Sequence, residues 1–410
     1  MLKVESIDKQ VSVLMHGSEF GDEQIKAMMT NELRQRLEEA QKEGRPLRVY
    51  CGYDVTAPDI HLGHTITMRK LRQFQQFGHE VTFLIGTFTT LIGDPSDRDT
   101  ARAEAIFETV KRNAETYAEQ AFRILDRNKT KVRYNYEWLS KLTFSDILRL
   151  ASFFTVQQLL SRDRIRNRIE KNDPISLREF LYPLGQGYDA VVLQADVQLG
   201  ATEQLFNLMA GRRLQEAFGQ KPQVCITFPV LIGTDGEKRM SKSTGNYIGI
   251  SEPPENIFGK IMSIPDKLII HYFTLLTDAT SEELEEYQRQ MNEGVNPMEL
   301  KKHLAHKIVA ELYDENSAAE AEAHFAKVVQ NKEIPDEVPV LKISDSNQDI
   351  RKLLVENGYL SSMGEAVRLI KQGGLKIDGE RISSFNVNLQ NGSIIQIGKR
   401  NFIKIEIVNE

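Results

Sequence analysis

Short apolar runs alternate with longer amphipathic stretches along the N-terminal part of the chain. Four runs rich in β-branched and aromatic residues predict strands at 47–51, 81–85, 191–193 and 224–228. The stretches between these runs are longer and carry apolar residues at helical spacing. Because alternating strands and helices build parallel sheets, the pattern predicts a doubly wound α/β domain.

The pattern changes twice further along the chain. Residues 255–330 show helical periodicity without a convincing strand, which predicts a helical domain. Residues 331–340 combine two prolines with four charged residues, a composition typical of an exposed linker. We therefore expect an α/β domain with N-terminal helices at 1–254, a helical domain, a linker and a separate C-terminal domain at 341–410.

The C-terminal domain carries signals for two helices and a small sheet. Residues 349–357 form an amphipathic stretch that Gly358 ends, and residues 362–365 have the pattern of a capping box that opens a second helix. An Asp-Gly turn at 378–379 and an alternating run at 402–407 predict strands beside these helices. The pattern predicts a small α+β domain.

Composition narrows the class of protein. With 40% hydrophobic and 27% charged residues, and no apolar run near the ~20 residues that a membrane helix needs, the chain is typical of globular proteins without a membrane partner. The N-terminus lacks the apolar core of a signal peptide, which predicts a cytoplasmic protein. Two distant cysteines, Cys51 and Cys225, argue against a disulfide framework or a cysteine-rich metal site, so we expect no protein-bound metal.

The charge distribution sets the C-terminal domain apart. The net charge of −6 excludes an overall basic field that would attract nucleic acid. The C-terminal domain, in contrast, holds ten lysines and arginines against eight acidic residues. Five of its cations surround the two predicted helices and the first hairpin: Lys352, Arg368, Lys371, Lys376 and Arg381. They are candidates for contacts with RNA phosphates, and a solvated surface is the alternative.

The first motif with chemical content is His61-Leu-Gly-His64, which follows the strand at 47–51 and opens an amphipathic helix. A helix N-terminus offers unpaired backbone N–H groups and a positive dipole, and two imidazoles add hydrogen-bond donors for a polyphosphate. Gly63 allows a nucleotide to approach the backbone closely. The alternative is that the two histidines only cap the helix.

The second motif is Lys238-Arg-Met-Ser-Lys-Ser243, on a glycine-flanked loop after the strand at 224–228. A loop with three cations and two hydroxyls is able to close over a phosphate and neutralise the charge that grows in a transition state. The alternative is a solvated basic turn.

In this order and on these elements, the two motifs resemble the signature sequences of class I aminoacyl-tRNA synthetases. Four further segments resemble the pocket of the tyrosyl-tRNA synthetase family: 47–56, 91–96, 182–189 and 198–204. The tail resembles the S4-like RNA-binding domain of bacterial members. The resemblance implies a Rossmann-like nucleotide-binding core with a connective insertion, followed by the helical and S4-like domains.

The resemblance also implies which residues recognise the amino acid. Tyr50 and Asp189 would bind the phenolic hydroxyl of tyrosine. Phenylalanine would leave these buried polar groups unpaired, which disfavours it. Asp94, Tyr182 and Gln186 would hold the ammonium group.

For ATP, the resemblance implies that Thr56, His61 and His64 face the phosphates and that Cys51 and Thr67 lie near the ribose. Cys51 fits equally well as a small buried apolar residue. Further positions are carried over to the ATP site or to the orientation of the reacting groups: Gly52, Asp54, Gly63, Gln204, Arg239, Ser241, Lys242 and Ser243.

Two positions depart from the family pattern. Glu203 stands where many relatives have aspartate, which leaves its ribose contact open. Arg239 stands at the first basic position of the loop signature, with Lys238 just before it, whereas Lys242 matches the pattern. The basic stretch 162–171 falls where the family inserts its connective segment, and it fits either a tRNA contact or a solvated helix face.

The resemblance implies a tyrosine–tRNA ligase that makes tyrosyl-adenylate from tyrosine and ATP and then charges tRNA(Tyr), with Mg²⁺ accompanying ATP and a homodimer as the assembly. Two alternatives remain. A tryptophanyl-tRNA synthetase shares the core, but its pocket would not need Tyr50 and Asp189. An RNA-binding protein without catalysis would have no reason to keep His61, His64 and Lys242.

Overall fold

The computed structural model describes residues 5–94, 107–327, 338–382, 384–398 and 401–408. The chain divides into two compact units, Met1–Glu315 and Asn316–Glu410. The predicted linker at 331–340 lies mostly outside the described residues.

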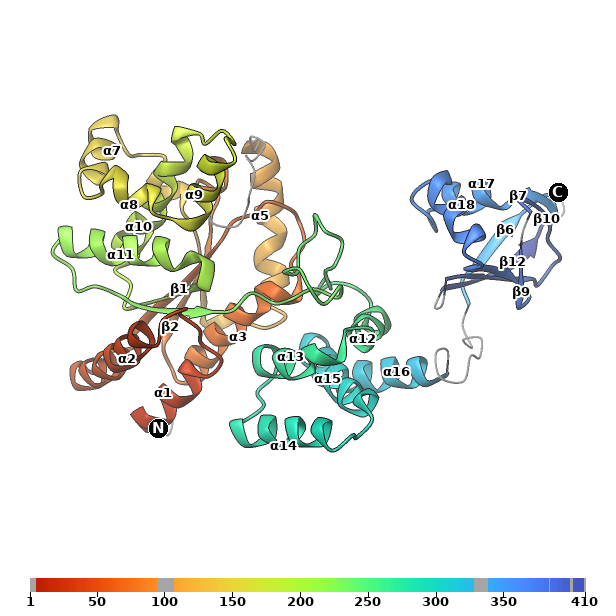
Figure 1. The fold of residues 1–410 in the computed structure, drawn as a ribbon, viewed down its shortest axis with the longest axis horizontal. Coiled ribbons are helices and arrows are strands. Elements are labelled where there is room, and N and C mark those ends of the chain that lie inside the picture. The colour runs from red at the N-terminus through yellow and green to blue at the C-terminus, as the bar shows by residue number, and fades with distance from the viewer. Residues whose placement is uncertain (1–4, 95–106, 328–337, 383, 399–400, 409–410) are drawn as a thin grey trace. The chain divides into compact units, whose positions relative to one another are not determined.

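The centre of the first unit is a five-stranded parallel sheet with the strand order β3-β2-β1-β4-β5 (Figure 1). Its strands are β1 (Arg48–Tyr53), β2 (Glu80–Ile85), β3 (Thr130–Tyr134), β4 (Val197–Ala201) and β5 (Val224–Phe228). β1 pairs with both β2 and β4, so the chain leaves the centre first through β2 and β3 and later, on the other side, through β4 and β5. The carboxyl ends of β1 and β4 therefore form the switch point at which doubly wound sheets bind ligands.

Three of the four strands predicted from the sequence are confirmed, those at 47–51, 81–85 and 224–228. The predicted strand at 191–193 is wrong, because these residues form the last turn of α10 (Tyr182–Leu193), which ends at Gln194 in the left-handed conformation. A short apolar run does not distinguish a strand from the buried end of a helix. The pattern also missed β3 and β4, in which charged, amide or glycine residues interrupt the apolar ones.

Helices lie on both faces of this sheet. The units β1-α3-β2 and β4-α11-β5 progress in opposite directions, so right-handed crossovers place α3 and α11 on opposite faces. The helices up to the end of the sheet are α1 (Ile7–Met15), α2 (Glu23–Glu43), α3 (Leu62–Gln76), α4 (Thr89–Ile92), α5 (Phe107–Ala121), α6 (Tyr136–Leu139), α7 (Phe144–Ala151), α8 (Val156–Leu160), α9 (Asp163–Glu170), α10 and α11 (Leu205–Ala217). Short 3₁₀ turns are η1 (Arg127–Lys129), η2 (Leu177–Leu181) and η3 (Thr202–Gln204).

The N-terminal helix α1 is anchored to α3 and to the end of β5. Nζ of the buried Lys70 donates to the carbonyl oxygens of Val13 and His16 at the end of α1, at 2.8 and 3.3 Å. Burial lowers the pKa of Lys70 to about 7. The Glu19 N–H donates to the Thr227 carbonyl at 2.8 Å, and the Thr227 hydroxyl donates back to the Glu19 carbonyl. The N-terminal segment thus contacts two elements that border the ligand site.

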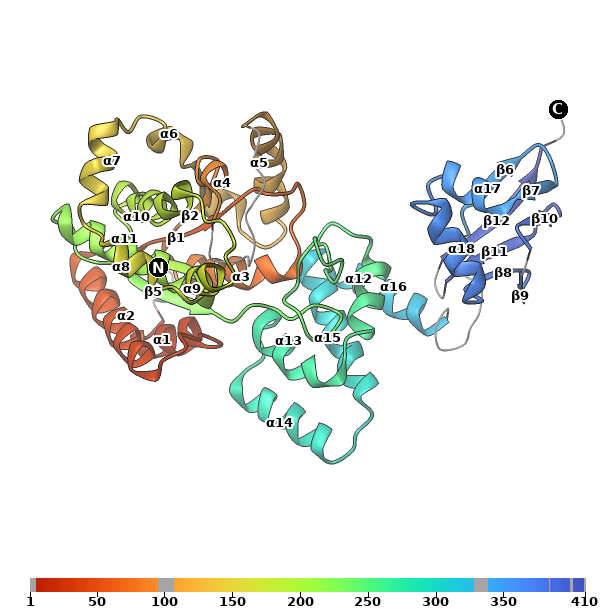
Figure 2. The ribbon, with the colours of Figure 1, turned by 45° about the horizontal axis from the view of Figure 1, so that its top comes forward.

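A helical group follows the sheet and confirms the helical character predicted for the described part of 255–330. It comprises α12 (Pro254–Met262), η4 (Asp266–Leu268), α13 (Ile269–Leu276), α14 (Ser281–Asn292) and α15 (Pro297–Leu312). The next helix, α16 (Glu315–Phe325), belongs to the second unit except for its first residue. Within the first unit, α13 packs against both α3 and α15 (Figure 2). In the ranges that the structure describes, no helix is long and apolar enough to cross a membrane.

The second unit confirms the small α+β domain. A five-stranded sheet has the order β6-β12-β11-β8-β9, and β10 pairs separately with β7. Its elements are β6 (Val340–Ile343), β7 (Asn347–Asp349), α17 (Ile350–Glu356), α18 (Met363–Lys371), β8 (Leu375–Ile377), β9 (Glu380–Arg381), β10 (Asn386–Asn388), β11 (Ile394–Ile397) and β12 (Asn401–Ile407). Apolar side chains from the sheet and from both helices form one core.

One detail of the predicted helix cap in this unit differs. The Ser362 hydroxyl accepts the Glu365 N–H at 3.2 Å, as a capping box requires. The Glu365 carboxylate, however, binds the N–H and the hydroxyl of Ser361, at 2.8 and 2.6 Å, and not the Ser362 N–H. Because Ser361 offers two donors to one carboxylate oxygen, Glu365 binds Ser361, one residue before the helix cap Ser362.

Candidate active site

A two-lobed cavity opens at the switch point of the sheet. The inner lobe, about 250 Å³, lies at the carboxyl ends of β1 and β4 beside α10. The outer lobe, about 390 Å³, lies between the start of α3 and the loop after β5. Both lobes share five wall residues: Thr56, Gly63, His64, Thr67 and Ala201. The shared residues place the two lobes side by side, an arrangement suited to two ligands that react with each other.

The first signature motif forms the N-terminus of α3, as predicted. Nδ1 of His61 accepts the Gly63 N–H at 3.1 Å, and Nδ1 of His64 accepts the His61 N–H at 3.2 Å. An imidazole that accepts through Nδ1 carries its proton on Nε2, so each ring retains an N–H donor. Burial lowers the pKa of both imidazoles, that of His64 to about 4. The two histidines are therefore helix caps and neutral hydrogen-bond donors at the same time.

The second signature motif forms the facing wall of the outer lobe. Asn246, which is buried, organises this loop: its Oδ1 accepts the Ser241 N–H at 2.8 Å and the Thr244 hydroxyl at 2.6 Å. Its Nδ2 donates to Oδ2 of Asp235 at 2.8 Å and to the Arg239 carbonyl at 3.1 Å. One amide side chain thus fixes the backbone on both sides of the motif.

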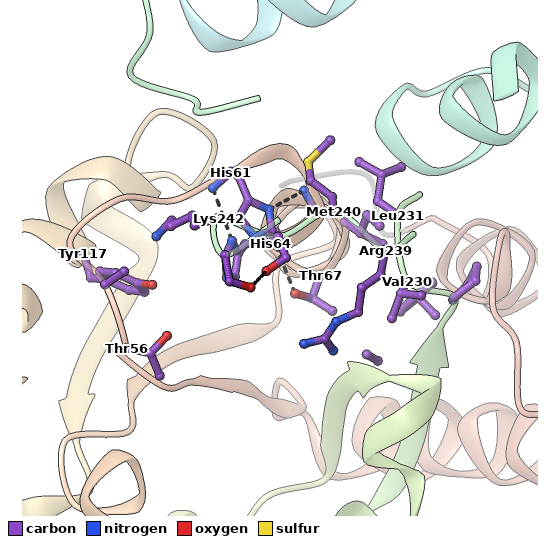
Figure 3. Close-up of a pocket in the computed structure, with 18 residues that line it drawn as sticks. Thr56, His61, His64, Thr67, Tyr117, Val230, Leu231, Arg239, Met240 and Lys242 are labelled. Carbon is purple, nitrogen blue, oxygen red and sulfur yellow. Dashed lines mark hydrogen bonds between the residues drawn. The ribbon is translucent and has the colours of Figure 1, made fainter. Parts of the chain in front are cut away.

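Two cations of the loop face the outer lobe, on either side of His64 in Figure 3. Arg239 forms an ion pair with Glu203 of η3, with 2.9 Å between Nη1 and Oε2. Lys242 donates from Nζ to the Asp59 carbonyl, and burial lowers its pKa. Lys238 is exposed and does not line the lobe, so Arg239 is the first cation of the motif that faces it.

A buried carboxylate, that of Asp189, lines the inner lobe. Oδ1 of Asp189 accepts the Trp138 Nε1–H at 2.7 Å, and Oδ2 accepts Asn135 Nδ2 at 3.2 Å. Burial raises the pKa of Asp189 to about 8, although these two hydrogen bonds favour its ionised form. Both oxygens are oriented by neighbours, so the remaining lone pairs face a ligand in a defined direction.

A second carboxylate, Asp54, lies at the side of the inner lobe. Its Oδ1 accepts the Thr89 hydroxyl at 2.7 Å and its Oδ2 accepts the Tyr182 hydroxyl at 3.0 Å. Thr89 also accepts Asn135 Nδ2 at 3.0 Å, which links this group to Asp189. Gly86 is required here, because a Cβ at this position would collide with the side chains of both Asp54 and Thr89.

Acceptors gather at the mouth of the inner lobe. Gln204 donates from Nε2 to Asp94, and Asn207 donates to Oε1 of Gln204 at 2.9 Å. Oε1 of Gln186 is buried and has no hydrogen-bond partner among the described residues. A buried acceptor without a donor is costly. This position therefore suits a ligand that brings N–H donors, such as an ammonium group.

The structure brings together most of the site residues predicted from the sequence. Those that line the inner lobe, the outer lobe or both are Cys51, Gly52, Asp54, Thr56, His61, Gly63, His64, Thr67, Asp94, Tyr182, Gln186, Asp189, Gln204, Arg239, Ser241, Lys242 and Ser243. Cys51 lines the inner lobe and is also buried, and burial raises the pKa of its thiol to about 11. The thiol therefore stays protonated.

Two predicted residues do not line the cavity. Tyr50 is 1% exposed and packs in an apolar cluster with Trp138 and Leu84. Its hydroxyl has no hydrogen-bond partner of good geometry in the described part of the chain. Glu203 is occupied by ion pairs at the rim. The ligand contacts of these two residues stay predictions.

Sequence reasoning missed several residues that shape the site. Asn135 and Trp138 orient Asp189, Thr89 orients Asp54, and Asn246 holds the loop. Trp138 is the sole tryptophan of the chain, which is a weak signal. Asn135 and Thr89 bind partners 54 and 35 positions away, so the sequence carries no signal for them. Asn246 lies within a few residues of its partners, and its place inside the loop was the available signal.

The basic stretch 162–171 forms α9 and the residues that flank it. Arg168 is 1% exposed and pairs with Glu179 at 2.6 Å. The Arg164 guanidinium pairs with Glu203 at the rim of the cavity. These arginines are structural partners within the unit, so the stretch is not simply a solvated face.

The five cations predicted to contact RNA lie on α17, on α18 and on the β8–β9 hairpin. Lys352, Arg368, Lys371 and Arg381 are exposed, and Lys376 is half-buried. Lys376 and Arg381 are paired residues of adjacent strands. The Arg381 side chain lies over Gly373, where a Cβ would come within 3.1 Å of it. The cations near the end of α18 and on the hairpin therefore share one part of the surface.

The chain matches two protein families. Residues 41–330 match the family described as tRNA synthetases class I (W and Y). Residues 330–405 match the family described as the Tyrosine–tRNA ligase SYY-like C-terminal domain.

Relatives of known name span nearly the whole chain. A protein named Tyrosine–tRNA ligase from Thermotoga maritima is 48% identical and covers 94% of this chain and 97% of its own length. A protein of the same name from Carboxydothermus hydrogenoformans is 45% identical over 98% of this chain and 99% of its own length. A third, from Haemophilus influenzae, is 48% identical over 90% of this chain and 92% of its own length.

Solved structures share the fold at lower identity. A tyrosyl-tRNA synthetase from Archaeoglobus fulgidus, complexed with L-tyrosine, has a TM-score of 0.60 at 22% identity and covers 77% of this chain and 100% of its own. A C-terminally truncated mitochondrial tyrosyl-tRNA synthetase from Aspergillus nidulans has a TM-score of 0.62 at 19% identity, covering 79% of this chain and 94% of its own. These likenesses confirm the doubly wound α/β core.

Proposed function

The chain belongs to the tyrosine–tRNA ligase family of class I tRNA synthetases, and we propose that its two-lobed cavity joins tyrosine and ATP before tyrosine is transferred to tRNA(Tyr). One observation carries the assignment of the lobes. The signature helix and the signature loop both face the outer lobe, whereas the oriented Asp189 and the unpaired Gln186 oxygen face the inner lobe.

The inner lobe would hold tyrosine with its phenol at Asp189. The carboxylate, already oriented by Trp138 and Asn135, accepts the phenolic O–H, and we assign the buried Tyr50 hydroxyl as the second partner of the phenol. Neither tryptophan nor phenylalanine offers a hydroxyl at this point. The lobe therefore favours tyrosine over the tryptophan alternative.

The other end of the amino acid would lie among the acceptors at the mouth of the inner lobe. Asp94 and the unpaired Oε1 of Gln186 accept the ammonium N–H groups. The Tyr182 hydroxyl donates to Asp54, so toward the ammonium it would act as an acceptor. Asp54 and Gln204 orient these groups and keep the carboxylate of tyrosine pointed at the outer lobe.

In the outer lobe, ATP would lie with its phosphates against the start of α3. The Nε2–H groups of His61 and His64 and the Thr56 hydroxyl would donate to phosphate oxygens. The ribose would lie toward Thr67, which lines both lobes, and toward Cys51 in the inner lobe. Neutral imidazoles donate without repelling Lys242. The backbone at Gly52 and Gly63 leaves room for close contact, and the hydroxyls of Ser241 and Ser243 close the loop side.

The reaction needs no nucleophile from the protein. A carboxylate oxygen of tyrosine forms a bond with the α-phosphorus as the bond to the β-phosphate oxygen breaks, and pyrophosphate leaves with the electron pair. Lys242 and Arg239 stabilise the charge that grows on the leaving group, and positioning supplies most of the remaining rate. The hydroxyl at the 3′ end of tRNA then displaces AMP from the carbonyl carbon and loses its proton.

Mg²⁺ would accompany ATP and neutralise phosphate charge when bound. Mg²⁺ prefers carboxylate oxygens, yet the described residues that line the outer lobe carry hydroxyls, imidazoles and cations and no carboxylate. No cluster of metal-binding side chains exists among the described residues. The ion would therefore be held mainly by the phosphates of ATP. Because the reaction serves translation, we place the protein in the cytoplasm.

A homodimer would bury the exposed apolar residues between α7 and η2. These residues are Phe144, Leu148, Val156, Ile169 and Leu177, which are 78%, 56%, 66%, 51% and 77% exposed in the single chain. Large apolar side chains that gather on one stretch of a protein surface are typical of interfaces. Sedimentation should give a dimer, and Leu177→Asp should shift it toward monomer.

We also keep the four-part division of the chain at 254, 330 and 340 as a proposal, with RNA contacts in the last part. Support comes from the exposed cations on α18 and on the β8–β9 hairpin.

Exchange of pyrophosphate with ATP, measured with each of the twenty amino acids, tests the proposed function. We expect exchange with tyrosine and little with phenylalanine or tryptophan. Comparable exchange with tryptophan would contradict the assignment of the inner lobe.

A further inference from the structure

The carboxylate of Glu203 is shared between two arginines that come from different parts of the first unit. Arg164 of α9 binds Oε1 through Nη2, and Arg239 of the signature loop binds Oε2 through Nη1 at 2.9 Å. Glu203 belongs to η3, between Ala201, which lines both lobes, and Gln204, which lines the inner lobe. The carboxylate therefore lies at the rim where the two lobes meet.

We propose that Arg164 is a positioning residue for ATP: it holds Oε1 of Glu203 so that Oε2 serves Arg239 in the empty cavity and the ribose hydroxyls of ATP in the loaded one. This inference rests on the proposed function, because it takes ATP as the ligand of the outer lobe. Arg164 does not line either lobe. Its effect on ATP would therefore pass through Glu203.

The length of the glutamate side chain explains why a second arginine is needed. Glutamate has one more rotatable bond than aspartate, and fixing a flexible side chain opposes binding through lost entropy. An arginine on a helix, already paired, fixes the carboxylate before the ligand arrives. The entropy lost in fixing the Glu203 side chain is then part of folding and does not weaken ATP binding.

The same geometry makes the contact with Arg239 exchangeable. The three side chains are 31%, 24% and 32% exposed for Arg164, Glu203 and Arg239, and ion pairs that reach solvent are weak. A ribose hydroxyl that donates to Oε2 releases the Arg239 guanidinium. The released cation is then available to the phosphates, where negative charge develops during the reaction.

The test compares the binding of ATP with that of 2′,3′-dideoxy-ATP, which lacks both ribose hydroxyls, by calorimetry. In the unchanged protein we expect ATP to bind ~10-fold more tightly, the effect of a hydrogen bond to a charged group. In Arg164→Gln this ratio should fall to about 2, with the dissociation constant of tyrosine unchanged, and Arg164→Lys should restore part of it. Arg166→Gln removes the same charge from the same helix and should leave the ratio intact.

Three results separate the possible outcomes. A full ribose ratio in Arg164→Gln would overturn the positioning role, and an equal weakening of both nucleotides would mean that Arg164 acts on the fold. Arg239→Gln tests whether Arg239 and the ribose compete for Glu203. Without the arginine, the affinity of ATP relative to dideoxy-ATP should stay the same or rise. A lower relative affinity would overturn the competition. The binding measurement needs no turnover. A protein that shows no tyrosine-dependent ATP/pyrophosphate exchange but does show these affinity ratios would refute the proposed function and leave this inference standing.

Discussion

Replacing Asp189 with asparagine should remove most of the preference for tyrosine over phenylalanine. The substitution keeps the size of the side chain and changes what its second atom offers. One amide oxygen can still accept the Trp138 Nε1–H, which lies 2.7 Å from the carboxylate, but the amide NH₂ then faces Asn135 Nδ2, another donor, 3.2 Å away. The phenolic O–H loses a charged acceptor as well.

The size of the effect follows from the hydrogen bond that is lost. A hydrogen bond to a charged group contributes ~1.5–3 kcal/mol, which corresponds to a factor of about 10 to 150 in kcat/KM. Phenylalanine makes no such bond, so its kcat/KM should change little. The tyrosine-to-phenylalanine ratio should therefore fall by about 10- to 150-fold.

The assay is ATP/pyrophosphate exchange at pH 8.5 with each amino acid. This pH lies above the value of about 8 to which burial raises the pKa of Asp189, so the unchanged protein carries the carboxylate. Because the folded-state pKa lies above the unfolded one, the contribution of Asp189 to stability is present at low pH and lost as the pH rises through about 8. Asparagine does not titrate, so it has no such pH-dependent contribution to stability. Thermal unfolding of the variant at pH 8.5 therefore shows whether the substitution disturbs the packing.

A matched control is Asp196→Asn, which changes a buried aspartate remote from the cavity. Asp196 accepts from Arg45 at 2.8 Å and from the Arg48 N–H at 2.9 Å. This variant should be less stable to unfolding and should keep the tyrosine-to-phenylalanine ratio of kcat/KM. An Asp189→Asn protein that is folded and retains the full ratio would refute the reasoning, since the carboxylate would then be structural.

The remaining predictions concern the outer lobe, a glycine and the tail. Lys242→Ala should slow single-turnover adenylate formation ~100-fold, about 2.7 kcal/mol, with an unchanged tyrosine dissociation constant; equal loss of both would indicate misfolding. Because the pKa of His64 is lowered to about 4, its imidazole, followed by NMR, should stay neutral from pH 8 to 5.5 and take up a proton only toward pH 4; a midpoint near 6.5 would contradict neutral capping. Gly86→Ala should weaken tyrosine binding, because the added Cβ displaces Asp54 and Thr89, while ATP binding alone, by calorimetry, should not change. A protein that ends near residue 337 should keep tyrosine-dependent exchange and lose most tRNA charging; undiminished charging would show that the tail is not an RNA-binding element.

The sequence predicts those parts of the site whose chemistry is local along the chain. The histidine motif was placed correctly because its hydrogen bonds join neighbouring residues, so the caps of α3 follow from the spacing alone. The orientation of Asp189 by Trp138 joins residues 51 positions apart, and no periodicity encodes that contact.

The errors in the fold have a similar origin. The run 191–193 is apolar because it ends a helix that packs on α11, whereas the true strand β4 includes Gln198 and Gly200. Tyr50 matched the family pattern, and its ligand contact stays a prediction; its packing beside Trp138 and Leu84 is a contact that the sequence does not encode. In each case, contacts with residues distant along the chain determine the local structure.

The anchoring of the N-terminal segment bears on how the protein forms during synthesis. Glu19 leaves the ribosome early, yet its partner Thr227 lies 208 residues further along the chain. Contacts of such long sequence separation form late, because the closure of a long loop precedes any gain from the contact. A nascent chain that ends before β5 lacks the paired hydrogen bonds between Glu19 and Thr227 and exposes the edge of β4. The nucleotide-binding wall and the anchor of the N-terminus should therefore appear in the same late step, and a chaperone that binds nascent chains would find its target before that step.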